Sequence, residues 1–392
     1  MLWRLRSILR RLRLAMRPMR ERGLGQAAVL LVHVPVATML RAWRVMALQL
    51  NRAVNQHQFN RTRLTRFLDA LPASALPRLV VIVMPSTLHF LLPCLALLQG
   101  RAQLILLGNG AHRWEHRTLR ERFPELPMFD LRTLPASSVA HGDVISLLLA
   151  HHRGNFGIVD HDCYVFDDTL FDQLEPANGE VLVSLFGEKS RDLNATYPLT
   201  HLMYFNAEAL RGLMQRHRID ARLYRETPPS VRDALARQGL GPGIHWKWYH
   251  TFHDTLLVLV AVAQDEGLRV RYLTTADEAA ALHVGGTSIG SHHTKSLAAL
   301  YTHLCFLELL DDPLLWRGYA FMAAPLKSSK QALALLRADA DDPASRGLPV
   351  VERLMQRLRD RLQAPAGCAG RPGSAVGLAG SVAAAETRQS GL

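Results

Sequence analysis

The sequence predicts an α/β protein in which a mainly parallel sheet is flanked by helices and preceded by a basic helical N-terminal arm. Two observations lead to this prediction. From about residue 77 onward, short apolar runs alternate with segments of helical periodicity, which is the pattern of parallel strands joined by crossover helices. The positive charge, by contrast, is confined to the first 66 residues, which have no such alternation.

The net charge of +12 divides into two unlike parts. Residues 1–66 hold 14 arginines, no lysine and one acid, for a net +13, whereas the remaining 326 residues hold 32 bases and 33 acids, for −1. A nearly neutral body argues against a protein built to bind nucleic acid. The four cysteines lie far apart and lack the spacing of a metal site or a disulfide framework, which indicates a reduced, cytoplasmic chain.

The arm, residues 1–70, begins as an amphipathic helix. Within residues 1–19, apolar residues recur every three or four positions and arginines follow the same steps shifted by one. Such a helix can lie in a membrane interface with its guanidinium groups on lipid phosphates, so we expect a peripheral protein on the cytoplasmic face of a membrane. The next apolar run, residues 27–40, is shorter than the roughly 20 residues of a spanning helix. Packing of the arm on protein, binding to nucleic acid and organelle targeting are the alternatives.

The body, residues 77–345, is expected to fold as one domain around the sheet. Strands are expected at 79–84, 103–107, 128–131, 156–159, 181–186, 201–205 and 269–273. Helices are expected at 88–99, 113–123, 143–152, 254–266 and 297–310. A C-terminal helix is expected within 346–363, and the Gly-, Ala- and Ser-rich residues 364–392 are expected to be disordered.

The strongest chemical signal follows the apolar run 156–159. Asp160 and Asp162 stand one residue apart directly after this strand, and a divalent cation that neutralises both would explain them. A metal held there can bind a diphosphate and neutralise a departing phosphate. Ligands of parallel sheets bind beyond the carboxyl ends of the strands, which is also where Pro85 and Asn109 fall.

The segment around Asp160 and Asp162 resembles the Asp-x-Asp region of nucleotide-sugar glycosyltransferases of the GT-A fold, in particular family 2-like inverting enzymes. Three later segments agree with that family in order and spacing. Residues 201–206 resemble the strand behind the acceptor site, residues 252–255 resemble the acidic motif that opens a helix, and residues 283–288 resemble a His-containing loop that returns to the metal. The resemblance covers about residues 79–291.

This resemblance implies a metal-dependent, hexosyltransferase-type enzyme that moves a sugar from a nucleoside-diphosphate donor to an acceptor hydroxyl with inversion. A cell-envelope glycan or a lipid-linked saccharide is the implied product. Asp254 would be the catalytic base, and the metal, Mn2+ or Mg2+, would be held by Asp160, Asp162 and His283. The donor would lie against Pro85, Thr87, Asn109 and Asp160. The acceptor would contact Trp246, Trp248, Tyr249 and Asn206.

Two other protein classes remain open on the sequence. A haloacid-dehalogenase-like phosphatase also carries Asp-x-Asp after an apolar strand, but Tyr164 stands where that motif normally has Thr or Val. A non-catalytic, membrane-associated scaffold with a transferase-like body is the other class. Single residues have structural alternatives as well: Asp254 as a helix N-cap, His283 as a turn residue and Trp246 as a core residue.

Overall fold

The computed structural model describes residues 39, 42–43, 45–190, 193, 196–246, 252–273, 280–285, 297–323, 326–338 and 347–363. The predictions for the helix at 1–19, for the tail at 364–392 and for Trp248 and Tyr249 lie outside the described residues.

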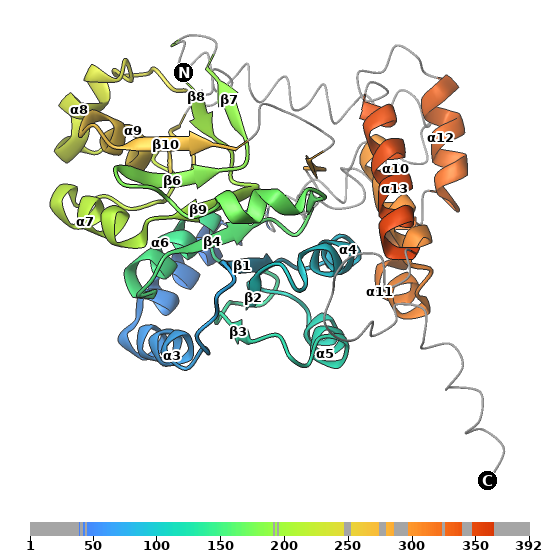
Figure 1. Cartoon of the computed structure of the whole chain (residues 1–392). Coiled ribbons are helices and arrows are strands. Elements are labelled where there is room, and N and C mark those ends of the chain that lie inside the picture. Colours follow the sequence, from blue (N-terminus) through green and yellow to red (C-terminus); the bar gives the residue numbers. More distant parts are fainter. Residues whose placement is uncertain are drawn as a thin grey trace.

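A seven-stranded sheet forms the centre of the molecule, in the order β10-β6-β9-β4-β1-β2-β3 (Figure 1). β1 pairs in parallel with β2 and β4, β2 with β3, and β6 with β10, whereas β9 runs antiparallel to both β4 and β6. The strands are β1 (Arg78–Val83), β2 (Gln103–Gly108), β3 (Met128–Asp130), β4 (Phe156–Val159), β6 (Glu180–Ser184), β9 (Leu202–Phe205) and β10 (Arg269–Tyr272). The predicted mainly parallel sheet is therefore confirmed.

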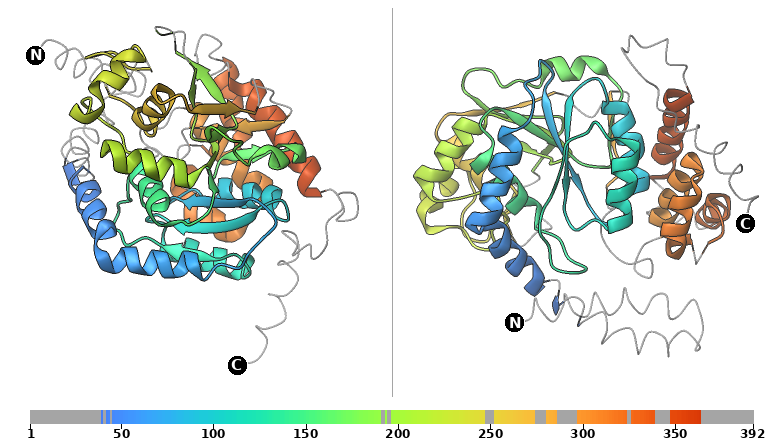
Figure 2. Two further views of the ribbon diagram at one scale, coloured as in Figure 1. Left: turned by 60° about the vertical axis from the view of Figure 1, so that its left-hand side comes forward. Right: turned by 90° about the horizontal axis from the view of Figure 1, so that it is seen from below.

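Helices cover both faces of this sheet (Figures 1 and 2). They are α3 (Gln58–Asp69), α4 (Leu88–Leu98), α5 (Arg113–Arg122), α6 (His141–His151), α7 (Ala207–His217), α8 (Arg232–Arg237) and α9 (Leu257–Asp265), with short 3-10 helices at Asp168–Gln173 and Pro229–Val231. The side chains of β1 alternate between the faces: Leu79, Val81 and Val83 pack with α4, and Val80 and Ile82 pack with α3, α6, α7 and α9. Since both faces are buried, β1 is a continuous apolar run rather than an alternating one.

A C-terminal group of helices extends the α4 face. It consists of α10 (Leu297–Leu310), α11 (Pro313–Ala323), α12 (Ser329–Ala338) and α13 (Leu348–Gln363). Figures 1 and 2 show this group on one side of the molecule, and α10 and α13 both pack on α4. Leu354 and Leu358 of α13 are buried in the same core cluster as β1 and α4. In the part of the chain that the structure describes, no helix is long and apolar enough to cross a membrane.

Several elements differ from the sequence predictions. The helix expected from Asp254 begins at Leu257, because Leu256 adopts a left-handed backbone (φ 67°) that interrupts it. Asp254 is therefore not the N-cap of α9; its Oδ1 accepts a hydrogen bond from the N–H of Thr255 at 2.8 Å. Four three-residue strands escaped prediction because so short a run has no readable period: β5 (Cys163–Val165), β7 (Gly187–Lys189), β8 (Thr196–Pro198) and β11 (Ala281–His283).

Candidate metal centre

The antiparallel strand β9 brings His201 to the carboxyl end of β4. Asp160 directly follows β4, and its N–H donates to the carbonyl of His201 at 2.8 Å. Because β9 runs opposite to β4, the residue that precedes β9 lies beside the residue that follows β4. Nδ1 of His201 consequently lies 3.6 Å from Oδ2 of Asp160.

A second antiparallel pair delivers His283 to the same place. The chain turns after Asp160 into β5, which pairs with β11 so that His283 stands opposite Cys163. The N–H of Val284 donates to the carbonyl of Asp162 at 3.1 Å and fixes this register. Nε2 of His283 lies 3.2 Å from Oδ1 of Asp162 and 3.9 Å from Oδ2 of Asp160.

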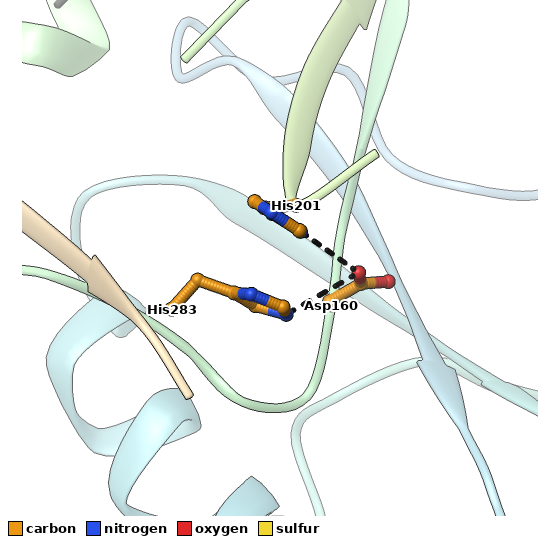
Figure 3. A group of neighbouring side chains, drawn as sticks. All are labelled: Asp160, His201 and His283. Atoms are coloured by element: carbon orange, nitrogen blue, oxygen red, sulfur yellow. Dashed lines mark ion pairs between the residues drawn. The ribbon is translucent and has the colours of Figure 1, made fainter. Parts of the chain in front are cut away.

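Asp160, His201 and His283 form a compact cluster of candidate ligands (Figure 3). One ligand atom of each lies within 4.8 Å of the others. The two imidazole rings stack, with centroids 3.4 Å apart and planes inclined by 15°. The three side chains are 24%, 20% and 17% exposed, so the cluster is lined by protein and still reachable from solvent.

The donor chemistry of this cluster fits a divalent cation. Among the described residues, Nδ1 of His201 is buried without a hydrogen-bond partner, although it faces the Asp160 carboxylate. Burial lowers the pKa of His201, so the ring is neutral at pH 7, which is the form that ligates a metal. One carboxylate and two imidazoles suit Mn2+ better than Mg2+, because Mg2+ prefers an all-oxygen set.

The two predicted carboxylate ligands, Asp160 and Asp162, both lie close to Nε2 of the predicted ligand His283. Asp160 and His283 lie in the cluster of three, while Asp162 is 5% exposed and contacts His283 from the protein side. His201 was missed as a ligand. It precedes the apolar run 202–205, and only the antiparallel direction of β9 brings it to Asp160.

Asp254 lies near the start of α6. The N–H of Leu256 donates to the carbonyl of Ala221 at 2.9 Å. The carbonyl of Ala221 also lies against Gly142 in the first turn of α6. A Cβ added to Gly142 would be only 2.6 Å from that carbonyl oxygen. α6 begins at the edge of the sheet where β2 and β4 end, since Asn109, directly after β2, is hydrogen-bonded to Val139. Asp254 and Asp160 therefore belong to the same edge of the sheet.

Two residues predicted to contact the nucleotide have structural roles. The Thr87 side chain is fully buried, and its hydroxyl donates to the carbonyl of Met84 at 2.8 Å. Asn109 is 1% exposed; its amide donates to the carbonyl of Val139 at 2.9 Å and accepts from the N–H of Val139 at 2.7 Å. The polar groups of both side chains are engaged in hydrogen bonds that hold strand ends, and their predicted contact with the nucleotide stays a prediction. Pro85 is half-buried beside them and stays a prediction.

The predicted acceptor residues that the structure describes, Trp246 and Asn206, have structural contacts, and their role in acceptor binding stays a prediction. Trp246 is 2% exposed and stacks on Tyr197 in the core, with centroids 6.2 Å apart. Asn206 follows the antiparallel β9 and therefore lies at the opposite edge of the sheet from Asp160. Its Oδ1 accepts from the N–H of Ala209 at 3.1 Å, so Asn206 is the N-cap of α7.

Residues 54–210 match the family model of the StrH glycosyltransferase N-terminal domain. This match confirms the predicted resemblance to glycosyltransferases and favours a glycosyltransferase enzyme over a phosphatase or a scaffold. The matched range contains Asp160, Asp162 and His201, whereas Asp254 and His283 lie beyond it. A search of curated proteins finds no match to the chain.

Solved structures with a local likeness include three transferases. The bifunctional glycosyltransferase WbbM is 10% identical over 52% of this chain and 40% of its own, with a TM-score of 0.29. The glycosyltransferase GlyE of Streptococcus pneumoniae TIGR4 is 12% identical over 36% of this chain and 40% of its own, with a TM-score of 0.26. The inositol-1-phosphate CTP transferase of T. maritima is 9% identical over 56% and 94%, with a TM-score of 0.31. The chain thus spans 40% of the length of the first two structures.

Proposed function

We propose that this glycosyltransferase is a metal-dependent enzyme of the GT-A type that moves a sugar from a nucleoside-diphosphate donor to an acceptor hydroxyl. The observation that carries the proposal is the convergence of Asp160, His201 and His283 at the carboxyl edge of the sheet. Two of these three residues lie in the range that matches the glycosyltransferase domain. Ligands bind at this edge in open α/β sheets.

Asp160, His201 and His283 would hold the cation, with Mn2+ favoured by the two imidazoles. The bound cation would supply positive charge to the donor diphosphate. Asp162 would be a further ligand, since its Oδ1 lies 3.2 Å from Nε2 of His283, the same ring nitrogen that faces Asp160.

The transfer we propose is a single displacement. The acceptor oxygen bonds to the anomeric carbon as the bond from that carbon to the diphosphate oxygen breaks, and the nucleoside diphosphate leaves with the electron pair. The proton of the acceptor hydroxyl passes to the carboxylate of Asp254. Because the oxygen attacks the face opposite the leaving diphosphate, the anomeric configuration is inverted. The location of Asp254 near the start of α6, at the same edge as Asp160, supports this role.

The arm supports a membrane-bound setting for the reaction. Within the helical residues 45–56, the side chains of Met46, Leu50 and Val54 are 49%, 45% and 37% exposed, and their spacing of four places them on one stripe. Together with the arginines of residues 1–66, this stripe supports binding of the arm to an anionic membrane surface on the cytoplasmic side. A cell-envelope glycan or a lipid-linked saccharide is the product we propose.

The donor site is tested by calorimetric titration of the full chain with UDP, GDP and dTDP, each with and without Mn2+. We expect one nucleotide to bind only with Mn2+, and the corresponding nucleotide sugar to be hydrolysed slowly in the absence of acceptor. Equal binding in EDTA would overturn the metal-dependent mechanism. Release of phosphate from an aryl phosphate would instead favour the phosphatase class.

The base and the membrane contact need separate experiments. Asp254→Asn is expected to lower transfer by about 100-fold or more while leaving Mn2+-dependent nucleotide binding unchanged. Retained transfer would remove Asp254 from the mechanism. For the arm, we expect the full chain to pellet with vesicles containing anionic phospholipid and to stay in the supernatant with neutral vesicles or at high salt.

A further inference from the structure

A cavity of about 420 Å³ adjoins the candidate metal centre. It lies between β11, α4, α10 and α13, on the side of the sheet where Figure 1 shows the C-terminal helices. His283 lines this cavity and also belongs to the metal cluster. The cavity and the metal cluster therefore share His283 as a common wall residue.

The lining of the cavity is mainly apolar. Aliphatic and aromatic side chains come from all four elements, among them Phe90, Leu282, Ala298, Val351 and Leu354. The lining residues of the described chain include no lysine, arginine, aspartate or glutamate. A nucleoside diphosphate needs cationic groups or hydrogen-bond donors for its phosphates, and a sugar needs several polar partners. The lining fits neither of them.

Two of the polar side chains in the wall, Thr302 and His303, have partners within the protein. The hydroxyl of Thr302 donates to the carbonyl of Ala298 at 2.9 Å. Nδ1 of His303 lies 2.7 Å from Nε2 of His89, and both rings are almost fully buried. An apolar ligand can occupy this cavity without breaking these hydrogen bonds and without burying a charge.

We propose that this cavity binds the aliphatic chain of the acceptor, so that the rest of the acceptor extends past His283 toward the candidate metal centre. The inference rests on the proposed glycosyltransferase function and names the acceptor class: a lipid or an alkyl glycoside rather than a free sugar. The volume is in the range of pockets that hold small organic ligands. Because His283 both lines the cavity and belongs to the metal cluster, a ligand in the cavity lies next to the candidate metal centre.

The direct test is calorimetric titration of the full chain with n-alkan-1-ols of four to ten carbons. Each additional buried methylene is expected to strengthen binding about three- to fourfold until the cavity is filled. Absence of binding, or affinity independent of chain length, would overturn the proposal.

Two variants locate the binding site. Ala298→Phe on α10 and Val351→Phe on α13 each place a ring in the cavity, from two different helices, and should weaken octan-1-ol binding at least tenfold. Leu335→Phe is the matched control because Leu335 of α12 is 49% exposed and does not line the cavity. Unchanged octan-1-ol binding in both cavity variants, with thermal unfolding like that of the control, would place the ligand elsewhere and overturn the inference.

The acceptor role is tested by transfer to octyl and methyl glycosides of the same sugar. Ala298→Phe should lower kcat/KM for the octyl acceptor at least tenfold, with little change for the methyl acceptor and for Mn2+-dependent nucleotide binding. An equal loss for both acceptors would contradict a role in holding the chain. If nucleotide sugars are not consumed at all while octan-1-ol binding still depends on Ala298, the proposed function fails and the cavity remains an apolar binding site.

Discussion

The central sheet has polar residues both at the edge where β4 ends and at the edge where β4 begins, but these residues have different kinds of partner. At the edge where β4 ends, Asp160, His201 and His283 converge, and a buried nitrogen of His201 has no hydrogen-bond partner among the described residues. At the edge where β4 begins, His152 and Asn206 are as polar, yet each is tied to the backbone of a neighbouring segment.

The partners of the polar groups separate the two edges. His152 has Nδ1 at 2.8 Å from the carbonyl of Gly154, and Nη1 of Arg78 at 3.1 Å from its Nε2. These bonds satisfy both ring nitrogens, so His152 stabilises the fold. In the cluster at Asp160, by contrast, Nδ1 of His201 has no hydrogen-bond partner among the described residues and could bind a ligand. Residue type alone therefore does not identify a site; the partners of the residue decide.

The largest difference between the two edges is expected when a carboxylate is neutralised at each and sugar transfer is measured. Asp160→Asn keeps the shape of the side chain and removes its charge, so sugar transfer should fall by about 100- to 1,000-fold. Steady-state kinetics with the identified nucleotide sugar measure the loss. Asp69→Asn is the control from the other edge, where Asp69 pairs with Arg153 on the surface, and less than a twofold change is expected.

The role of His201 is tested by a substitution that keeps its ring. His201→Phe retains a flat side chain to stack on His283 but has no nitrogen for a metal, so Mn2+ affinity should fall by about 10- to 100-fold. Titration of Mn2+ in the presence of the nucleoside diphosphate measures this. His151→Phe, at the end of α6 and the opposite edge, should leave the affinity unchanged. Equal Mn2+ affinity in the two variants would remove His201 from the site.

At the opposite edge we expect an effect of pH on stability. Burial lowers the pKa of His152 to about 4, below the value of about 6.5 in the unfolded chain. The folded state then binds fewer protons than the unfolded state between these values, so the contribution of His152 is complete above pH 6.5 and is lost as the pH falls toward 4. It should amount to about 2 kcal/mol between pH 7.5 and 5.

Urea unfolding of the natural chain and of His152→Gln at the two pH values measures this contribution. The natural chain should lose more stability on acidification than the variant. The same loss in both proteins would show that other groups, such as the buried His253, cause the acid sensitivity.

The smallest effect is expected at the N-cap of α7. Asn206→Ala removes the acceptor for the N–H of Ala209 and should lower the free energy of unfolding by about 1 kcal/mol, with kcat/KM unchanged. Asn206→Asp keeps a capping oxygen and should restore most of the stability. A loss of transfer without a loss of stability would instead support the predicted role of Asn206 in acceptor binding.

Much of the fold could be predicted because its strands are buried and its helices periodic. The expected strand at 156–159 matches β4, and the expected helix at 297–310 matches α10. The α9 start was wrong by three residues because a left-handed residue, Leu256, carries no sequence signal of its own. The burial of Trp246 could not be predicted, because an aromatic run has the same pattern in a core as at a sugar-binding site.

By itself, the sequence determined the separation of charge between arm and body and the parallel α/β class, and it predicted Asp160 as a candidate metal ligand; all three depend on local order and composition. The tertiary structure decided which polar residues meet. His201 joins Asp160, and Asn206 leaves it, because β9 runs antiparallel to β4. Strand direction depends on contacts between segments distant in the chain, and reversing one strand exchanges the residues at its two ends, so no local pattern could have assigned them.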